Sequence, residues 1–157
     1  MADKHNNDYL LGFHFSVSFI GLGDEDINIP FQEVSGLSAE VQVEEVAEGG
    51  VNTYVHRLPK PVKHGNLVLK KALSQSENNL TNWIKAATEN FDFKTCQIIV
   101  SIQGIKNDGK NGKAEPLKTW SFEGAYPVKV SYSDLSAQKG ELTIQTLELA
   151  YQYSKQK

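Results

Sequence analysis

The sequence predicts a mainly β domain with one α-helix, in which two packed antiparallel sheets form a β-barrel or sandwich and the helix lies on the outside. Three observations support this prediction. Apolar and polar residues alternate with a period of two in several segments, as in half-buried strands. Only one segment has the three-and-four spacing of an amphipathic helix. Turn-forming residues at Asn107-Asp108-Gly109 and Gln138-Lys139-Gly140 predict hairpins, and therefore antiparallel pairing.

The chain has the size and composition of one domain. Its 157 residues are 39% apolar, which is enough for one continuous core. We expect a flexible N-terminal tail at residues 1–9, a single β-barrel domain at residues 10–153 and a C-terminal tail at residues 154–157. Cys96 is the one cysteine, so no internal disulfide can hold the fold together.

Charge and hydropathy exclude several classes of partner. The net charge is -3 at pH 7, and the lysines and the single arginine are scattered along the chain, which argues against sequence-specific nucleic-acid binding. The N-terminus lacks the apolar core of a signal peptide, and no segment approaches the ~18 apolar residues of a membrane span. We therefore expect no membrane insertion, and we expect the chain to be made and folded in the cytoplasm.

The alternating segments predict most of the strands. In the first, Phe13, Phe15, Val17 and Phe19 alternate with His14 and serines, so one face is buried. Ala39, Val41 and Val43 alternate with Glu40, Gln42 and Glu44 in another strand, which therefore has one apolar and one acidic face. Further strands are expected at residues 66–71, 96–102, 119–122, 127–132 and 141–153.

Residues 47–65 predict a long inter-strand loop. Gly49-Gly50, Pro59 and Pro61 interrupt any regular period. Long loops in compact domains are usually functional or disordered, and apolar residues argue against disorder. We expect this loop to contact another subunit, with Arg57 pairing with an acidic strand of the neighbour. The predicted interface residues are Val51, Tyr54, Val55, His56, Arg57 and Leu58, together with Glu40 and Glu44.

The one helix is predicted to start near a capping box formed by Ser74 and Glu77. Its apolar stripe comprises Leu80, Trp83, Ile84 and Ala87. Such a stripe packs on a sheet by one face. We expect these four residues to cover the barrel of their own subunit.

No pattern in the sequence predicts catalysis, a metal site or a cofactor. The segment from Gly104 to Lys110 nearly matches a phosphate-binding P-loop, but Asn111 replaces the Ser or Thr and no helix follows. His56 and His64 have no neighbouring cysteine and no zinc-ligand spacing. Cys96 lacks a nearby histidine to activate it. We therefore expect a protein that is not an enzyme and that binds no cofactor.

The order of several motifs resembles the tail tube (inner tube) family of contractile phage tails and extracellular contractile injection systems. The resemblance covers most of the chain, although Ala72 stands where the family often has glycine and Val130 where an aromatic residue is common. The motifs are Phe31-Gln-Glu-Val34-Ser-Gly36-Leu37, Glu48-Gly49-Gly50, Arg57-Leu58-Pro59-Lys60-Pro61, Asn66 to Leu73, Trp83, Trp120-Ser-Phe122, Ala125-Tyr-Pro127-Val-Lys129, Leu135-Ser-Ala137, and Ile144 to Leu149 with Tyr151.

The resemblance implies a structural subunit that assembles into six-membered rings, which stack into a hollow tube propelled by sheath contraction. Its implied partners are further copies of itself, the sheath protein, baseplate, spike and tube-terminating proteins, and cargo in the channel. Polar strand positions would then line the channel, for example Ser16, Ser18, Thr143 and Gln145. A type VI secretion tube protein and, in a different class, a monomeric ligand-binding β-barrel remain open alternatives. The kind of particle and the layer of the tube also remain open.

Overall fold

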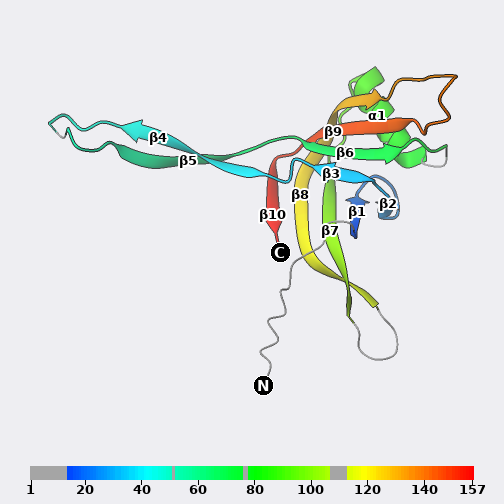
Figure 1. The fold of residues 1–157 in the computed structure, drawn as a ribbon, viewed down its shortest axis with the longest axis horizontal. Coiled ribbons are helices and arrows are strands. Elements are labelled where there is room, and N and C mark those ends of the chain that lie inside the picture. Colours follow the sequence, from blue (N-terminus) through cyan, green and yellow to red (C-terminus); the bar gives the residue numbers. More distant parts are fainter. Residues whose placement is uncertain (1–13, 51, 76–77, 107–112) are drawn as a thin grey trace.

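A computed structural model describes residues 14–50, 52–75, 78–106 and 113–157 (Figure 1). Its elements follow one another in the order β1 (Phe15–Ile20), β2 (Ile27–Ile29), β3 (Glu33–Ser35), β4 (Ala39–Val46), β5 (His56–His64), β6 (Leu67–Ala72), α1 (Asn78–Asn90), β7 (Cys96–Lys106), β8 (Lys113–Tyr132), β9 (Ile144–Ala150) and β10 (Tyr153–Gln156). The expected mainly β fold with one helix is confirmed for the described residues.

Eight strands make up the body of the molecule in two layers that share β8. They are hydrogen-bonded in the order β2-β1-β7-β8-β9-β6-β3, and β10 also pairs with β8. The first part of β8 pairs with β7, and its last part pairs with β9. The first layer is therefore β2, β1, β7, β8 and β10, and the second layer is β8, β9, β6 and β3. All these pairs are antiparallel, and β2 and β3 end the path unpaired with each other, so the arrangement is a sandwich rather than a closed barrel.

The C-terminal half differs from the expectation in two places. Residues 119–122 and 127–132 were expected as separate strands, but both belong to β8, because Gly124 adopts a φ of 65° and bends the strand without ending it. The expected C-terminal tail at 154–157 is largely strand β10. Lys157 continues this pairing, since its N–H donates to the Thr119 carbonyl at 2.8 Å. The expected tail at residues 1–9 lies outside the described residues.

The expected long loop at 47–65 is corrected by the structure. His56–His64 is strand β5, which pairs with β4 to form a two-stranded arm that projects from the body (Figure 1). Pro59 and Pro61 are tolerated because both strands of the arm are edge strands, where a missing N–H breaks no ladder. The register shifts between Val41 and Val43, so a β-bulge accommodates the proline-containing segment.

The core lies between the two layers, and α1 contributes to it. Trp83 packs edge-on against Phe19 of β1 at 6.0 Å between ring centroids, and its Nε1 donates a hydrogen bond to the Lys94 carbonyl at 2.6 Å. The structure places all four stripe residues of the helix in buried positions. The helix is described from Asn78, so the proposed capping role of Glu77 lies outside the described residues. The buried apolar residues include Val17, Phe19, Leu67, Leu69, Leu80, Trp83, Ile84, Ala87, Ile98, Val100, Phe122, Leu147 and Leu149.

The burial of Trp83 leads to a prediction about subunit stability. Trp83→Ala should destabilise the unassembled subunit by about 3–5 kcal/mol, because truncation leaves a cavity between α1 and β1. Trp83→Phe should cost less, because it keeps most of the packing and loses the hydrogen bond to Lys94. Thermal unfolding of monomeric protein measures both effects. Lys85→Ala, on the exposed side of α1, is the control, and equal melting temperatures for wild type and Trp83→Ala would contradict the packing role.

Candidate assembly interface

The arm exposes an apolar face that no part of its own described chain covers. Val41 lies directly opposite Val62, and Val43 lies opposite Pro59. These four residues form the arm face, and Val41 is 53% exposed. All eight residues of β4 are exposed. An isolated two-stranded hairpin is at best marginally stable in water, so this surface has the character of an interface without its partner.

Opposite charges pair along the arm. Lys60 Nζ lies 3.7 Å from Glu44 Oε2. Arg57 Nε lies 3.9 Å from Glu45 Oε1, so the guanidinium, expected beside Glu40 and Glu44 of a neighbour, has an acidic residue of its own chain beside it. Exposed pairs of this kind contribute about 0–1 kcal/mol each. They leave the charges available for other partners.

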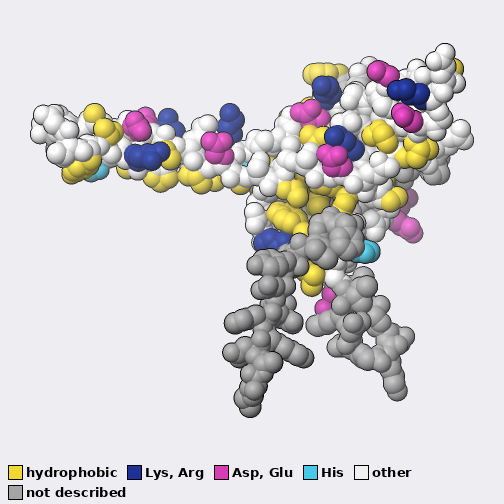
Figure 2. Space-filling view, viewed as in Figure 1, with side chains coloured by type: hydrophobic (Ala, Val, Ile, Leu, Met, Phe, Trp, Pro, Cys, Tyr) yellow, Lys and Arg dark blue, Asp and Glu magenta, His cyan; other side chains and the backbone are white. Residues whose placement is uncertain are grey.

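The tip of the arm carries further exposed apolar side chains. Tyr54 is 59% exposed and Leu58 is 51% exposed, and Val55 is also exposed. The Tyr54 ring contacts the edge of the His56 ring at 5.3 Å between centroids. Val51, another predicted interface residue, lies outside the described residues. Apolar side chains follow much of the length of the arm in the space-filling view (Figure 2).

The root of the arm is held tightly against the body. Gly36 has a φ of 83°, and a Cβ there would lie 2.1 Å from the Asn66 carbonyl oxygen, so only glycine permits this crossing. His64, the last residue of β5, contacts the Tyr151 ring at 5.3 Å between centroids. Burial raises the pKa of the Tyr151 hydroxyl. The arm therefore leaves the body at a fixed, close-packed crossing.

The outer face of the first layer is a hydrogen-bonded polar surface, here called the polar wall. Gln103 Nε2 donates to Ser16 Oγ at 2.9 Å, and the hydroxyls of Ser101 and Thr119 lie 3.2 Å apart. Ser18 lies on the same face, because it alternates with the buried Val17 and Phe19. The polar wall comprises Ser16, Ser18, Gln97, Ser101, Gln103, Thr119, Ser121 and Glu123, of which Ser101 is only 7% exposed; Ile20 and Ile99 lie on the same face.

Thr143 and Gln145 do not belong to the polar wall. Gln145 lies on the same side of β9 as the buried Leu147 and Leu149, and it is only 6% exposed. It lies beneath α1, where its Nε2 is 3.4 Å from the Tyr132 hydroxyl. Thr143 precedes β9 by one residue, with the same parity as Gln145. The expectation that Gln145 lines an open channel is therefore wrong, because β9 turns this polar residue towards the helix.

The sequence did not identify two members of the arm face. Pro59 and Val62 stood in a segment interpreted as a loop, because the two prolines and the bulge disguise the alternation of β5. A signal was nevertheless present. Residues 56–64 carry Leu58 and Val62 among charged residues, and this segment follows an acidic, alternating strand after a glycine pair.

Among the described residues, no group of three or more His, Cys, Asp or Glu side chains could hold a metal ion. Cys96 is buried, and desolvation raises the pKa of its thiol to about 12, so the thiolate that a nucleophile requires is scarcely formed at neutral pH. No helix in the described part of the chain is long and apolar enough to cross a membrane.

Solved structures contain chains with the same architecture. A chain of the anti-feeding prophage (AFP) baseplate, 6-fold symmetrised, is 27% identical, with a TM-score of 0.83 over 95% of each chain. A chain of the PVC sheath-tube complex, from an extracellular contractile injection system in its extended state, is 24% identical, with a TM-score of 0.76 over 97% of this chain and 93% of that one. A type six secretion system protein is 10% identical and has a TM-score of 0.52 over 92% of this chain and 82% of that one, which indicates a shared fold.

No curated protein sequence matches the chain. The family model of the T4-like virus tail tube protein gp19 matches residues 11–155, which is nearly the whole sequence. This match confirms the resemblance inferred from the motifs. The chain therefore belongs to the T4-like virus tail tube protein family.

Proposed function

We propose that this tube subunit assembles into six-membered rings, and that the rings stack into the hollow inner tube of a phage tail or a contractile injection particle. The observation that carries the proposal is the arm, whose apolar face is uncovered in the single chain. Family membership and the likeness to a chain of a six-fold baseplate support it. Contraction of a surrounding sheath would supply the energy, so the subunit needs no catalytic site and no cofactor.

The energetics of the arm favour a neighbouring copy as its cover. Fully burying a valine or leucine side chain contributes about 1.5–3 kcal/mol. The arm face and tip expose several such side chains, so their burial gives each contact a substantial driving force. A projecting arm that binds elsewhere on the next copy makes a heterologous contact, and such contacts build closed rings or open stacks.

The predicted interface residues form two groups, one apolar and one charged or polar, with different parts in the proposed contact between copies. Tyr54, Val55 and Leu58, with Val51 beside them in sequence, supply apolar contact at the arm tip. Arg57, Glu40 and Glu44 supply charges that orient the neighbour, because complementary charges fix register more than they raise affinity. His56 supplies a polar ring beside them.

We propose that the polar wall lines the channel. Its hydroxyl and amide groups bond to one another across β1, β7 and β8, so few groups remain to hold a passing molecule. Ser16 and Ser18 keep their proposed place in this lining. Gln145 is left out of the lining, because it is buried beneath α1. Thr143 is also left out, because it lies just before β9 and away from β1, β7 and β8.

The assembly would be completed by other proteins of the particle. A sheath protein around the tube, a baseplate and spike at one end and a terminating protein at the other are the proposed partners, with cargo in the channel. We place folding and assembly in the cytoplasm of the producing cell. A type VI secretion tube protein is the related alternative, and its shared fold gives it the same subunit role.

Electron microscopy and size-exclusion chromatography of the purified full-length chain test the function directly. Rings or tubes with six-fold end views are the expected result. A stable monomer at every concentration would instead favour the ligand-binding alternative.

Loss of the arm tip should abolish assembly without unfolding the subunit. Tyr54→Ser combined with Leu58→Ser removes exposed apolar area, so the melting temperature of the monomer should stay unchanged while rings disappear from micrographs. Leu73→Ser is the matched control, because Leu73 is also 51% exposed but lies off the arm. Normal tubes formed by the double variant would show that the arm tip has another role.

Arg57→Lys tests the electrostatic part of the interface. Lysine keeps the charge but loses the bidentate geometry of guanidinium with a carboxylate, so the concentration needed for assembly should rise severalfold. The effect should shrink as salt increases, because salt screens exposed charges. Light scattering over a concentration series measures it, and an unchanged assembly concentration and salt dependence would remove the claim.

Cysteine labelling tests the proposed channel lining. Ser16→Cys should react with a small maleimide in both states, but with a polymer-linked maleimide only before tubes form. Ser136→Cys, on the exposed segment after β8, is the control for a position outside the wall. Equal labelling of Ser16→Cys by the large reagent in finished tubes would place the polar wall elsewhere.

A further inference from the structure

Phe91 combines two uncommon features, a left-handed backbone conformation and an exposed aromatic ring. Helix α1 ends at Asn90, and the Asp92 N–H closes the end by donating to the Ala86 carbonyl at 2.9 Å. Phe91 between them has a φ of 54°, the left-handed conformation that glycine or asparagine normally supplies. It is also 83% exposed. Among the described residues it is the one non-glycine residue with a positive φ, so backbone strain and an exposed aromatic ring coincide there.

The Phe91 ring contacts one other aromatic ring, which in turn contacts a third. Phe91 contacts Phe93 edge-to-face at 4.9 Å between centroids, and Phe93 contacts Tyr126 of β8 at 5.7 Å. These three residues form the aromatic knob. The knob is anchored at the end of α1 and on β8, so it has a defined place on the body although its outermost ring is exposed. Backbone strain at an exposed residue supports a hypothesis of function.

The body also carries an apolar groove of suitable size, here called the Trp120 groove. Strands β7 and β8 run on beyond β3, so part of the inner face of the first layer has no second layer over it (Figure 1). The groove has a volume of about 270 Å³. An engineered cavity of about 150 Å³ binds benzene, so the groove has room for a phenyl ring. It is lined chiefly by Phe15, Val34, Leu37, Val100, Ile102 and Trp120.

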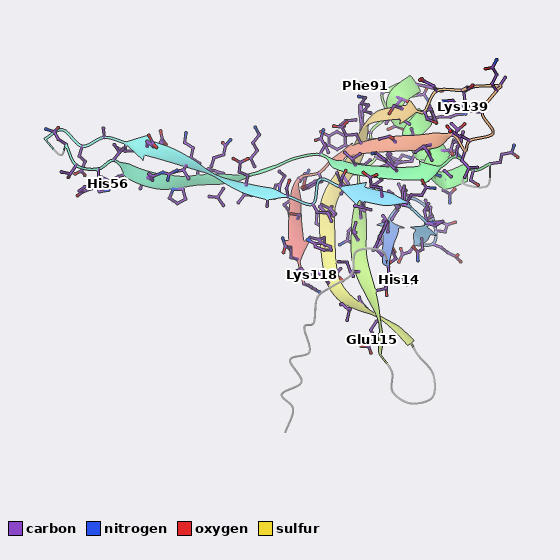
Figure 3. The ribbon with its side chains drawn as sticks, viewed as in Figure 1. His14, His56, Phe91, Glu115, Lys118 and Lys139 are labelled. Atoms are coloured by element: carbon purple, nitrogen blue, oxygen red, sulfur yellow. The ribbon has the colours of Figure 1, made fainter. Side chains whose placement is uncertain are left out.

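The knob and the groove lie on separate parts of the body. Figure 3 shows Phe91 at one end, beside α1, and His14 and Lys118 well away from it, on the other side of β3. His14 immediately precedes Phe15, and Lys118 Nζ lies 6.0 Å from the centre of the Trp120 ring. A knob and a groove on separate parts of the body cannot meet within one chain, but they can meet between two copies.

We infer that Phe91 of one subunit inserts into the Trp120 groove of a second copy of the chain. The contact is heterologous, and repetition of it extends an open stack rather than closing a dimer. This inference rests on the proposed self-assembly. It identifies one of the contacts by which copies would join head to tail. Burial of the ring in the groove offsets the strain and exposure that Phe91 imposes on the single subunit.

Phe91→Gly separates this role from a structural one. Glycine adopts the left-handed conformation without strain, so the monomer should keep or raise its melting temperature. The assembly concentration should rise at least tenfold, because the inserted ring is lost. Phe91→Tyr is the matched control, since it keeps the ring and should assemble nearly as wild type does. A lower monomer melting temperature with unchanged assembly of Phe91→Gly would overturn the inference.

Disulfide trapping tests the pairing of the two surfaces. Asp92→Cys combined with Glu33→Cys keeps the Phe91 ring and the apolar lining of the groove, and it should give, on mild oxidation, a ladder of covalent multiples of the subunit on non-reducing gels. Neither single variant should give more than a dimer. The native Cys96 is buried, with its thiol pKa raised to about 12, so it should not compete. Wild-type tubes in micrographs without any ladder would refute this contact and leave the tube function standing, whereas absence of wild-type rings would refute both.

Discussion

The fold depends on one constraint, which is that a single strand must belong to both layers. β8 spans 20 residues and pairs in turn with β7 and with β9, while β10 pairs along its first part. The change of layer takes place near Gly124, where a Cβ would lie 2.8 Å from the Gln152 side chain and φ is 65°. A side chain at this position would be strained and crowded, and the two layers would lose the bend that lets them enclose one core.

Sharing β8 also determines which surfaces remain for other molecules. The inner faces of both layers form the core together with Trp83 and Leu80 of α1. The outer face of the first layer keeps a polar wall, because every second residue of β1, β7 and β8 points away from the core. The apolar groups that remain exposed are concentrated where the two layers do not overlap and where the chain projects. The arm, the aromatic knob and the Trp120 groove are therefore consequences of the layer geometry.

Local patterns were enough to predict much of the fold but not its long-range features. The alternation in β1 and the stripe on α1 are set by neighbouring residues, so they could be predicted from the sequence. β5 was missed, because Pro59 and Pro61 are incompatible with a central strand and obscure its alternation, and only the isolated two-stranded arm admits them. The inward face of Gln145 follows from its alternation with Leu147 and Leu149, but the cover that α1 places over it could not be predicted, because α1 lies far from β9 in sequence. Likewise, nothing in the sequence near Phe91 indicates a left-handed backbone.

Two features depart from local sequence preferences, namely the left-handed backbone at Phe91 and the exposed apolar residues of the arm face. Both lie where we propose contact with another copy, and this placement has a physical reason. A sequence that satisfied every local rule would put glycine at position 91 and polar residues on the arm face, and its monomer would then have little to gain from association. Here the exposed apolar area and the strain are small costs relative to the stability of the core. In the proposed assembly, burial against a copy would offset both costs, so the gain would appear only in the assembled state and would increase with subunit concentration. A tube built on such contacts therefore needs no covalent links between subunits, and its single cysteine can remain buried in the core.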